Sequence, residues 1–246
     1  MSSPLTRSEM SSHTSTSILV VNPNSSFSIT RAIKQSLEPH IPLGVTAEFF
    51  NPSTGPAGIS DPATAQSSCE ACMEELPGLV DKYDGVLVAC FSDHPLVPTL
   101  ELYAKDKNLC LSVLGIYHAG IATALLRTRG KFGIIATGSG IKTNLIEATA
   151  KFLGSTTSDR FVGPITTDIS VVELQEGDQV EVERKMRSTT RDLVRKGAEV
   201  IILGCGGMCG MEPWIVDSAA EEGRQVQVVD GARMGFHMIL ALIHGT

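Results

Sequence analysis

The sequence predicts an α/β fold of two pseudo-symmetric, Rossmann-like lobes. Each lobe is expected to hold a mainly parallel, four-stranded sheet flanked by helices, with the functional site in the cleft between the lobes. Short apolar runs rich in Val and Ile alternate with segments of helical periodicity, a pattern typical of βαβ units. The two halves of the chain also resemble each other, and Cys90 and Cys205 end strands at equivalent points of these halves.

The predicted strands are nearly continuous apolar runs, as expected where a parallel sheet is covered on both faces. Segments with helical spacing of apolar residues lie between them. The expected strands span residues 17–22, 44–50, 85–91, 111–116, 132–136, 161–167, 200–204 and 226–230. The clearest expected helices span residues 26–37, 65–76, 144–153 and 179–196, and another helix ends the chain.

The internal similarity sets the expected domain organisation. Val20 and Ile134 open the two halves in similar strand-to-loop contexts 114 residues apart, and the two cysteines are 115 residues apart. Matching order and spacing support two lobes, with the last strand and helix returning to the first. The expected parts are a disordered, Ser/Thr-rich tail at 1–16, a first lobe at 17–116 plus 225–246, and a second lobe at 117–224.

Composition restricts the class of protein. The chain has 246 residues and a net charge of −7, which does not favour nucleic acids or anionic membranes as partners. No apolar run approaches the roughly 18 residues of a membrane span, and the first 17 residues lack the apolar core of a secretory signal. We therefore expect a cytoplasmic protein whose six cysteines are thiols rather than disulfides.

The two strand-end cysteines are the strongest candidates for chemistry. The carboxyl ends of parallel strands are where α/β proteins bind ligands. Both cysteines precede an expected helix start, where the helix dipole lowers a thiol pKa and favours the reactive thiolate. The alternative is that Cys90 and Cys205 are buried structural residues, because free cysteine is among the most buried residue types.

The loops after the two cysteines are suited to an anion. Gly206 and Gly207 allow the backbone to approach a ligand, and Ser92 and Asp93 are suitable caps for a helix beginning near Pro95. Backbone N–H groups at such helix starts stabilise negative charge that develops on a substrate oxygen. The presence of Ser92 and Asp93 is explained equally well by their being common turn residues.

Two further strand ends supply candidate substrate contacts. Asn22 stands at the tip of the first strand, whereas Asn24 and Ser25 are as well explained as helix caps. Thr137 and Gly138 occupy the matching point of the second half. The glycines there do not complete a dinucleotide fingerprint or a phosphate-binding loop, so no nucleotide cofactor is expected.

The remaining cysteines and histidines are weaker candidates. The pair Cys69 and Cys72 falls inside an expected helix without a second ligand pair, so neither a redox nor a metal site is predicted. Packing is the favoured role of Cys209. His118 follows the fourth strand and faces either the cleft or the surface. His94 lies close enough in sequence to Cys90 to help lower its thiol pKa.

Three motifs together resemble the hydantoin racemase branch, which includes allantoin racemases, of the aspartate/glutamate racemase superfamily. They are Val-Asn-Pro-Asn-Ser at 21–25, Ala-Cys-Phe-Ser-Asp at 89–93 and Leu-Gly-Cys-Gly-Gly-Met at 203–208, and the likeness covers 17 to about 245. It implies that Cys90 and Cys205 are catalytic and that the reaction needs no cofactor or metal. The substrate-binding residues it implies, together with the loop argument, are Asn22, Phe91, Ser92, His118, Thr137, Gly138, Gly206 and Gly207.

The chain departs from that family pattern at two places. Tyr117 and His118 stand where many hydantoin racemases have Gly-Glu, and Gly206 replaces a common alanine. The first departure bears more on which substrate is bound than on which class of reaction is catalysed.

The leading hypothesis is a cofactor-independent racemase or epimerase. One cysteine removes a proton from a carbon next to a carbonyl and the other returns a proton to the opposite face. The substrate is then a small hydantoin-like molecule, a 5-substituted hydantoin or allantoin, and the protein is expected to be a homo-oligomer. The alternatives are an isomerase that forms a cysteine adduct with an unsaturated diacid or specialised metabolite, and a non-catalytic, two-lobed small-molecule binding protein.

Overall fold

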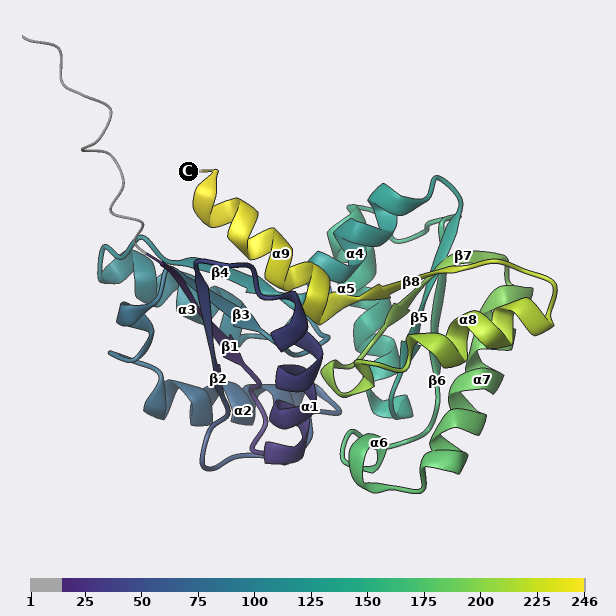
Figure 1. The fold of residues 1–246 in the computed structure, drawn as a ribbon, viewed down its shortest axis with the longest axis horizontal. Coiled ribbons are helices and arrows are strands. Elements are labelled where there is room, and N and C mark those ends of the chain that lie inside the picture. The colour runs from purple at the N-terminus through teal and green to yellow at the C-terminus, as the bar shows by residue number, and fades with distance from the viewer. Residues whose placement is uncertain (1–14, 246) are drawn as a thin grey trace, which may run out of the picture.

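The computed structural model describes residues 15–245, and its strands form two parallel sheets (Figure 1). The first sheet has the order β2-β1-β3-β4 and the second β6-β5-β7-β8, so the two sheets share one topology. The α/β fold predicted from the sequence is therefore confirmed. The strands are β1 (Thr16–Val21), β2 (Val45–Phe50), β3 (Gly85–Val88), β4 (Ser112–Gly115), β5 (Lys131–Ala136), β6 (Phe161–Thr166), β7 (Ala198–Leu203) and β8 (Gln227–Asp230).

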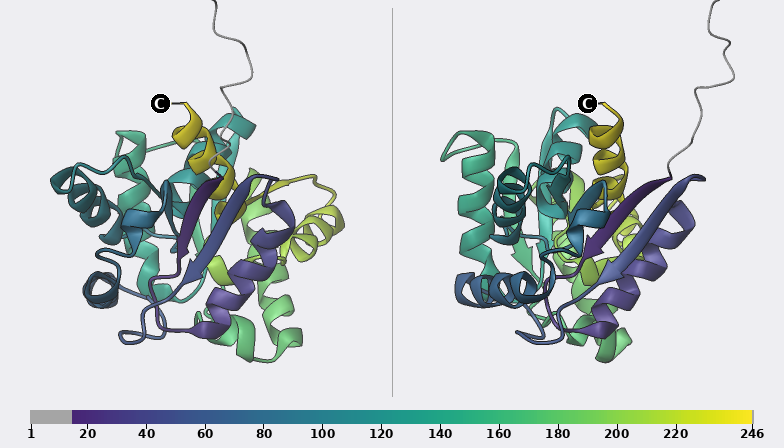
Figure 2. Two further views of the ribbon diagram at one scale, coloured as in Figure 1. Left: turned by 60° about the vertical axis from the view of Figure 1, so that its left-hand side comes forward. Right: turned by 90° about the vertical axis from the view of Figure 1, so that its left-hand side faces the viewer.

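Helices connect the strands and cover both faces of each sheet (Figure 2). The four clearest predicted helices correspond to α1, α2, α5 and α7. Helices α4 and α8 were not among the predictions. The helices are α1 (Phe27–Leu37), α2 (Pro62–Glu75), α3 (Leu96–Asp106), α4 (Ile116–Arg127), α5 (Lys142–Leu153), α6 (Glu173–Glu176), α7 (Gln179–Arg195), α8 (Glu212–Glu221) and α9 (Gly231–His244), with 3₁₀ turns η1 (Glu38–His40), η2 (Val80–Lys82), η3 (Ser139–Ile141) and η4 (Gly206–Met208).

A single hydrophobic core joins the two halves of the molecule. Ile18 and Leu87 of the first sheet and Phe132 and Ile202 of the second belong to one buried cluster, to which α1, α4 and α9 also contribute. Separate clusters lie under α2 and α3 on the first sheet and under α7 and α8 on the second. The fully buried strands explain why their sequences are continuously apolar rather than alternating.

The prediction for the chain end is corrected by the strand pairing. The strand at 226–230 was expected in the first lobe, but β8 pairs in parallel with β7 of the second sheet. The following helix α9 does contact β3 and β4 of the first sheet, and it packs along α4 (Figure 1). The apolar run alone could not distinguish the two sheets, because both need a fourth parallel strand. The predicted tail at 1–16 lies mostly outside the described residues, and Thr16 already belongs to β1.

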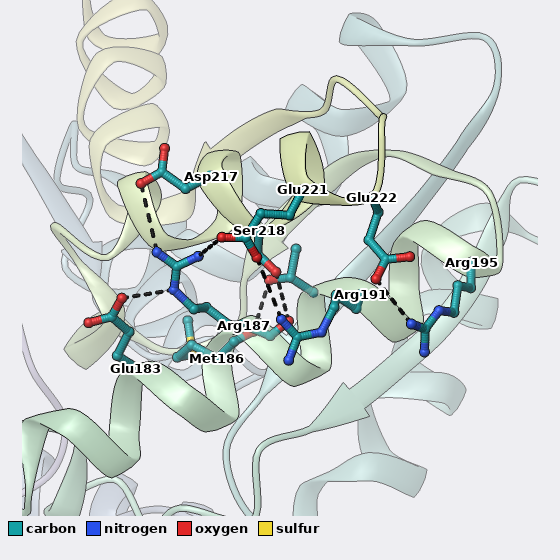
Figure 3. Close-up of polar contacts among 10 residues, drawn as sticks. Glu183, Met186, Arg187, Arg191, Arg195, Asp217, Ser218, Glu221 and Glu222 are labelled. Atoms are coloured by element: carbon teal, nitrogen blue, oxygen red, sulfur yellow. Dashed lines mark hydrogen bonds and ion pairs between the residues drawn. The ribbon is translucent and has the colours of Figure 1, made fainter.

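Helices α7 and α8 are tied together by a chain of ion pairs (Figure 3). The Arg187 guanidinium lies 2.8 Å from the Glu183 carboxylate and 3.0 Å from that of Glu221, and Arg195 lies 3.0 Å from Glu222. Ser218 also donates a hydrogen bond to the Arg187 carbonyl oxygen at 3.0 Å. Because exposed pairs contribute little singly, the network serves mainly to fix the orientation of α8 against α7.

His94, in the loop after β3, is fully enclosed. Its Nδ1 accepts a hydrogen bond from the Leu96 N–H at 3.1 Å, and its Nε2 lies 2.9 Å from the Ser68 hydroxyl. Burial lowers the pKa of His94 to about 4. The ring is therefore neutral at physiological pH and joins the loop to α2.

His94 should make the protein sensitive to acid. Its pKa is lower in the folded than in the unfolded chain, so its contribution is complete above about pH 6.5 and is lost as the pH falls toward 4. The shift corresponds to roughly 3 kcal/mol of unfolding free energy. Urea unfolding of the wild type and of His94→Asn between pH 7 and pH 4 measures this. Equal pH slopes in the two proteins would contradict the assignment.

Candidate active site

Cys90 and Cys205 line one small cavity, called here the thiol cavity, with a volume of about 30 Å³. Cys90 lies two residues beyond the end of β3, and Cys205 lies two residues beyond the end of β7, the equivalent strand of the second sheet. Asn24, Phe91, Thr137 and Gly206 line the cavity with them, as do the apolar side chains of Ile29, Ile59, Ile141 and Val171. The loops after β1, β3, β5 and β7 thus meet at one place.

Close backbone contacts hold the Cys205 loop against its neighbours. The Gly204 N–H donates a hydrogen bond to the Ile135 carbonyl oxygen at 2.8 Å, and a Cβ at Gly204 would collide with that oxygen. At Gly206 a Cβ would lie 3.0 Å from the Ala89 carbonyl oxygen, next to Cys90. Glycine at Gly206 therefore brings the loops nearer than the alanine common in the resembled family would allow.

The environment of both thiols differs from the prediction of a lowered pKa. Burial raises the pKa of Cys90 to about 12, opposed by a contact at 3.4 Å with the Ser92 hydroxyl and reinforced by the nearby Cys205. Burial also raises the pKa of Cys205 to about 11, opposed by the Gly207 N–H, which donates to its Sγ at 3.3 Å. Desolvation has a larger effect on each thiol pKa than the turn that follows the cysteine. Cys90 directly precedes no helix, and the turn η4 after Cys205 has only three residues.

The asparagine pair after β1 is arranged differently from the prediction. Asn22 is buried away from the thiol cavity, with its Nδ2 donating to Asn24 Oδ1 at 2.9 Å and to Thr30 Oγ1 at 3.0 Å. Asn24, which the sequence explained equally well as a helix cap, lines the cavity. Its Oδ1 also accepts the Ser26 N–H at 3.0 Å, and only an oxygen can accept that donor. This fixes the amide, leaving Asn24 Nδ2 as the end available to the cavity.

The other predicted contacts fall into two groups. Thr137, Phe91 and Gly206 line the thiol cavity. Ser92 contacts the Cys90 sulfur and Gly207 contacts the Cys205 sulfur. Gly138 instead lines a neighbouring cavity. Ile59 and Val171 were missed, because apolar loop residues distant in sequence give no signal of their own.

The structure does not bring the two candidate histidines to the thiols. His118 lies in the first turn of α4, with its Nε2 3.6 Å from the Asp93 carboxylate and its ring beside that of Phe152. The prediction that His94 helps to lower the Cys90 pKa is wrong, because a buried neutral ring supplies no positive charge. Tyr117 is fully buried, packs edge-on against Phe91 at 5.4 Å between ring centroids, and contacts the Thr149 hydroxyl.

The other cysteines are held in packing environments. Cys69 and Cys72 are buried on α2, as expected for a pair inside a helix. Cys209 contacts the Asp230 carboxylate at 3.9 Å.

Within residues 15–245, no group of three or more His, Cys, Asp or Glu side chains is arranged to hold a metal ion. No helix of that range is long and apolar enough to span a membrane.

Two larger cavities adjoin the thiol cavity. One, called here the outer pocket, has a volume of about 430 Å³ and lies between α2, α5 and the loop after β3. The other, about 520 Å³, is bordered by Gly58, Thr137 and Val171. Ile59, in the loop between β2 and α2, lines both the thiol cavity and the outer pocket and is 4% exposed. This loop reaches the second half, since a Cβ at Gly58 would lie 3.5 Å from the Val171 Cβ.

Comparison with known proteins gives consistent matches over nearly the whole chain. Residues 18–239 match the model of the family described as Asp/Glu/Hydantoin racemase. The protein DCG1 of Saccharomyces cerevisiae is 29% identical over 245 residues, covering 93% of this chain and 96% of its own. A hydantoin racemase of Rhizobium meliloti is 29% identical over 229 residues, covering 92% and 88%. The crystal structure of an allantoin racemase from Pseudomonas fluorescens has the same fold, with a TM-score of 0.78 at 24% identity, covering 93% and 91%.

Ile59 should control access to the thiols. Replacing it by alanine removes part of the wall between the outer pocket and the thiol cavity, so alkylation of Cys90 and Cys205 by iodoacetamide should become severalfold faster. Peptide mass spectrometry measures each rate, with the exposed Cys110 as an internal reference. Ile146→Ala, at an exposed position of α5, is the matched control. Equal rates in the two variants, both still folded by thermal unfolding, would rule out Ile59 as the barrier.

Proposed function

The chain belongs to the Asp/Glu/hydantoin racemase family, and from that premise we propose that it racemises a hydantoin-like substrate, a 5-substituted hydantoin or allantoin. The observation that carries the proposal is the meeting of Cys90 and Cys205 at one cavity from equivalent strands of two like sheets. A racemase of this kind needs an acid and a base on opposite faces of one carbon. Two thiols related by the pseudo-symmetry of the fold support the assignment of these roles to Cys90 and Cys205.

The proposed reaction transfers one proton out and one proton in. A cysteine thiolate takes the proton from C5 of the ring, and the electrons of the broken C–H bond move into the adjacent carbonyl as an enolate. The thiol of the other cysteine then protonates C5 from the opposite side and becomes the thiolate. The product is the mirror-image centre, and the reverse reaction starts from the exchanged protonation state. Protons balance without an oxidant or reductant.

Cys205 is proposed to carry the thiolate in the free protein. Burial raises its pKa to about 11, and the Gly207 N–H, which donates to its sulfur, opposes that rise. The raised thiol pKa values mean that only a small fraction of the protein holds a thiolate at neutral pH. They also make that thiolate a strong base, suited to removing a proton from carbon.

Asn24 is proposed to stabilise the enolate. Its amide oxygen is held by Asn22 and by the Ser26 N–H, so the Nδ2 group is presented to the cavity at no further cost in orientation. A donor fixed before the charge develops stabilises the transition state more than the ground state. Asn22 is then a positioning residue, which differs from the direct contact expected from the sequence.

Deuterium exchange tests the proposed reaction. One enantiomer of a 5-substituted hydantoin or of allantoin, incubated in heavy water, should take up deuterium at the stereocentre as its optical rotation declines. Cys90→Ser and Cys205→Ser should each abolish racemisation, because serine is too weak an acid to replace either thiol. The kcat/KM of the wild type should rise about tenfold per pH unit from pH 7 toward 10, since the active form needs one thiolate.

Cys110→Ser is the control for these variants, because Cys110 is exposed and lies outside the thiol cavity. Full activity in Cys205→Ser would contradict the two-base reaction. An absence of exchange with every compound, in a protein that still binds them, would instead favour a non-catalytic binding protein.

Asn24 variants test the enolate donor. Asn24→Ala should lower kcat by about 10²-fold with little change in KM. Asn24→Asp can still accept the Ser26 N–H but has no amide to donate and adds negative charge, so it should lose at least as much. Steady-state kinetics and thermal unfolding of both variants make the comparison. Activity within threefold of the wild type in either variant would exclude Asn24 as the donor.

A further inference from the structure

We propose that the outer pocket receives the substituent at C5 of the substrate and selects uncharged or cationic substituents over anionic ones. This inference rests on the proposed function, because it takes the thiol cavity as the place where C5 reacts. It goes beyond that function in naming a substrate class that this chain's own residues would prefer.

The volumes of the two cavities support a division of the substrate between them. The thiol cavity, at about 30 Å³, has room for little more than a water molecule, whereas the adjoining outer pocket holds about 430 Å³. Ile59 and Ile141 line both and form the wall between them. A ring held at the thiols would therefore displace this wall, and a substituent passing between the two isoleucines would enter the outer pocket.

The walls of the outer pocket are apolar on both sides. Pro62 and Ala65 of α2 face Leu145 and Ala148 of α5 across it. Apolar walls with a few placed polar groups are typical of small-molecule sites. They suit a substituent with a hydrocarbon stem or ring.

The charges around the outer pocket are predominantly negative. Asp61, Asp93 and Glu147 line it, and Lys151 is the single cation among the described lining residues. The Lys151 ammonium lies 2.9 Å from the Asp93 carboxylate, so its charge is already paired there. Asp61 accepts the Thr64 N–H at the start of α2, which keeps it ionised. Glu147, exposed on α5, adds a further negative charge.

This charge pattern disfavours a second carboxylate on the substrate. An anionic substituent entering the outer pocket would meet Asp61 and Glu147, while Lys151, the cation among the described lining residues, is already paired with Asp93. A neutral substituent can instead hydrogen-bond to Gln66 or Asn144, which also line the pocket. The same pattern argues against an unsaturated diacid as the substrate.

A matched pair of substrates tests the charge selection. Carboxyethylhydantoin and carbamoylethylhydantoin, each substituted at C5, have nearly the same shape and differ by one charge. The wild type should prefer the amide by about tenfold in kcat/KM. Glu147→Lys should reduce that preference severalfold, and Glu101→Lys, an equal charge change at an exposed position of α3 outside the pocket, should leave it unchanged.

Calorimetric binding of the same two compounds separates this inference from the proposed function. If neither compound exchanges deuterium, neither is a substrate of the proposed reaction, and the binding preference and its response to Glu147→Lys still decide the charge selection. Equal kcat/KM and equal affinity for the two compounds, or equal effects of Glu147→Lys and Glu101→Lys, would overturn the inference.

Filling the outer pocket tests where the substituent lies. Ala148→Leu places a larger side chain on the α5 wall, so kcat/KM for benzylhydantoin should fall at least tenfold, while that for methylhydantoin should change less than twofold. The small substrate is the internal control for folding and chemistry. A parallel loss with both substrates, or no loss with either, would place the substituent elsewhere.

Discussion

The parallel pairing of β1 with β3 and of β5 with β7 is the constraint on which the site depends. Parallel pairing sends the carboxyl ends of all strands of a sheet to one edge, so the residues that follow neighbouring strands are brought together without any direct attraction between them. The same topology in both sheets, joined by one core of α1, α4 and α9, then faces two such edges toward each other. Cys90 and Cys205 are neighbours in space because each follows the equivalent strand.

Much of this arrangement could be predicted from the sequence, because buried parallel strands leave a strong signal. Each predicted strand overlaps an observed one, and the offset between Cys90 and Cys205 already indicated equivalent positions. The sheet to which β8 belongs could not be predicted, because its apolar run could form the fourth strand of either sheet. Asn24 and Ile59 were beyond sequence reasoning for a different reason. Their roles depend on which way an amide is held and on where a loop crosses between the halves.

The thiol pKa values show how enclosure competes with local backbone geometry. A turn or helix start lowers a thiol pKa through oriented N–H groups, and Gly207 does donate one to Cys205. Desolvation acts on the same sulfur in the opposite direction and is the larger effect at both cysteines. Both sulfurs lie in a cavity whose lining includes the apolar side chains of Ile59 and Val171.

The two departures from the resembled family affect different parts of the site. Gly206 lies where the loops of Cys90 and Cys205 approach each other, so it affects how close these two loops can come. Tyr117 is buried behind Phe91, and its neighbour His118 contacts Asp93 at the edge of the outer pocket. The Tyr-His pair therefore lies toward the outer pocket, whereas Gly206 lies at the strand ends that hold Cys90 and Cys205.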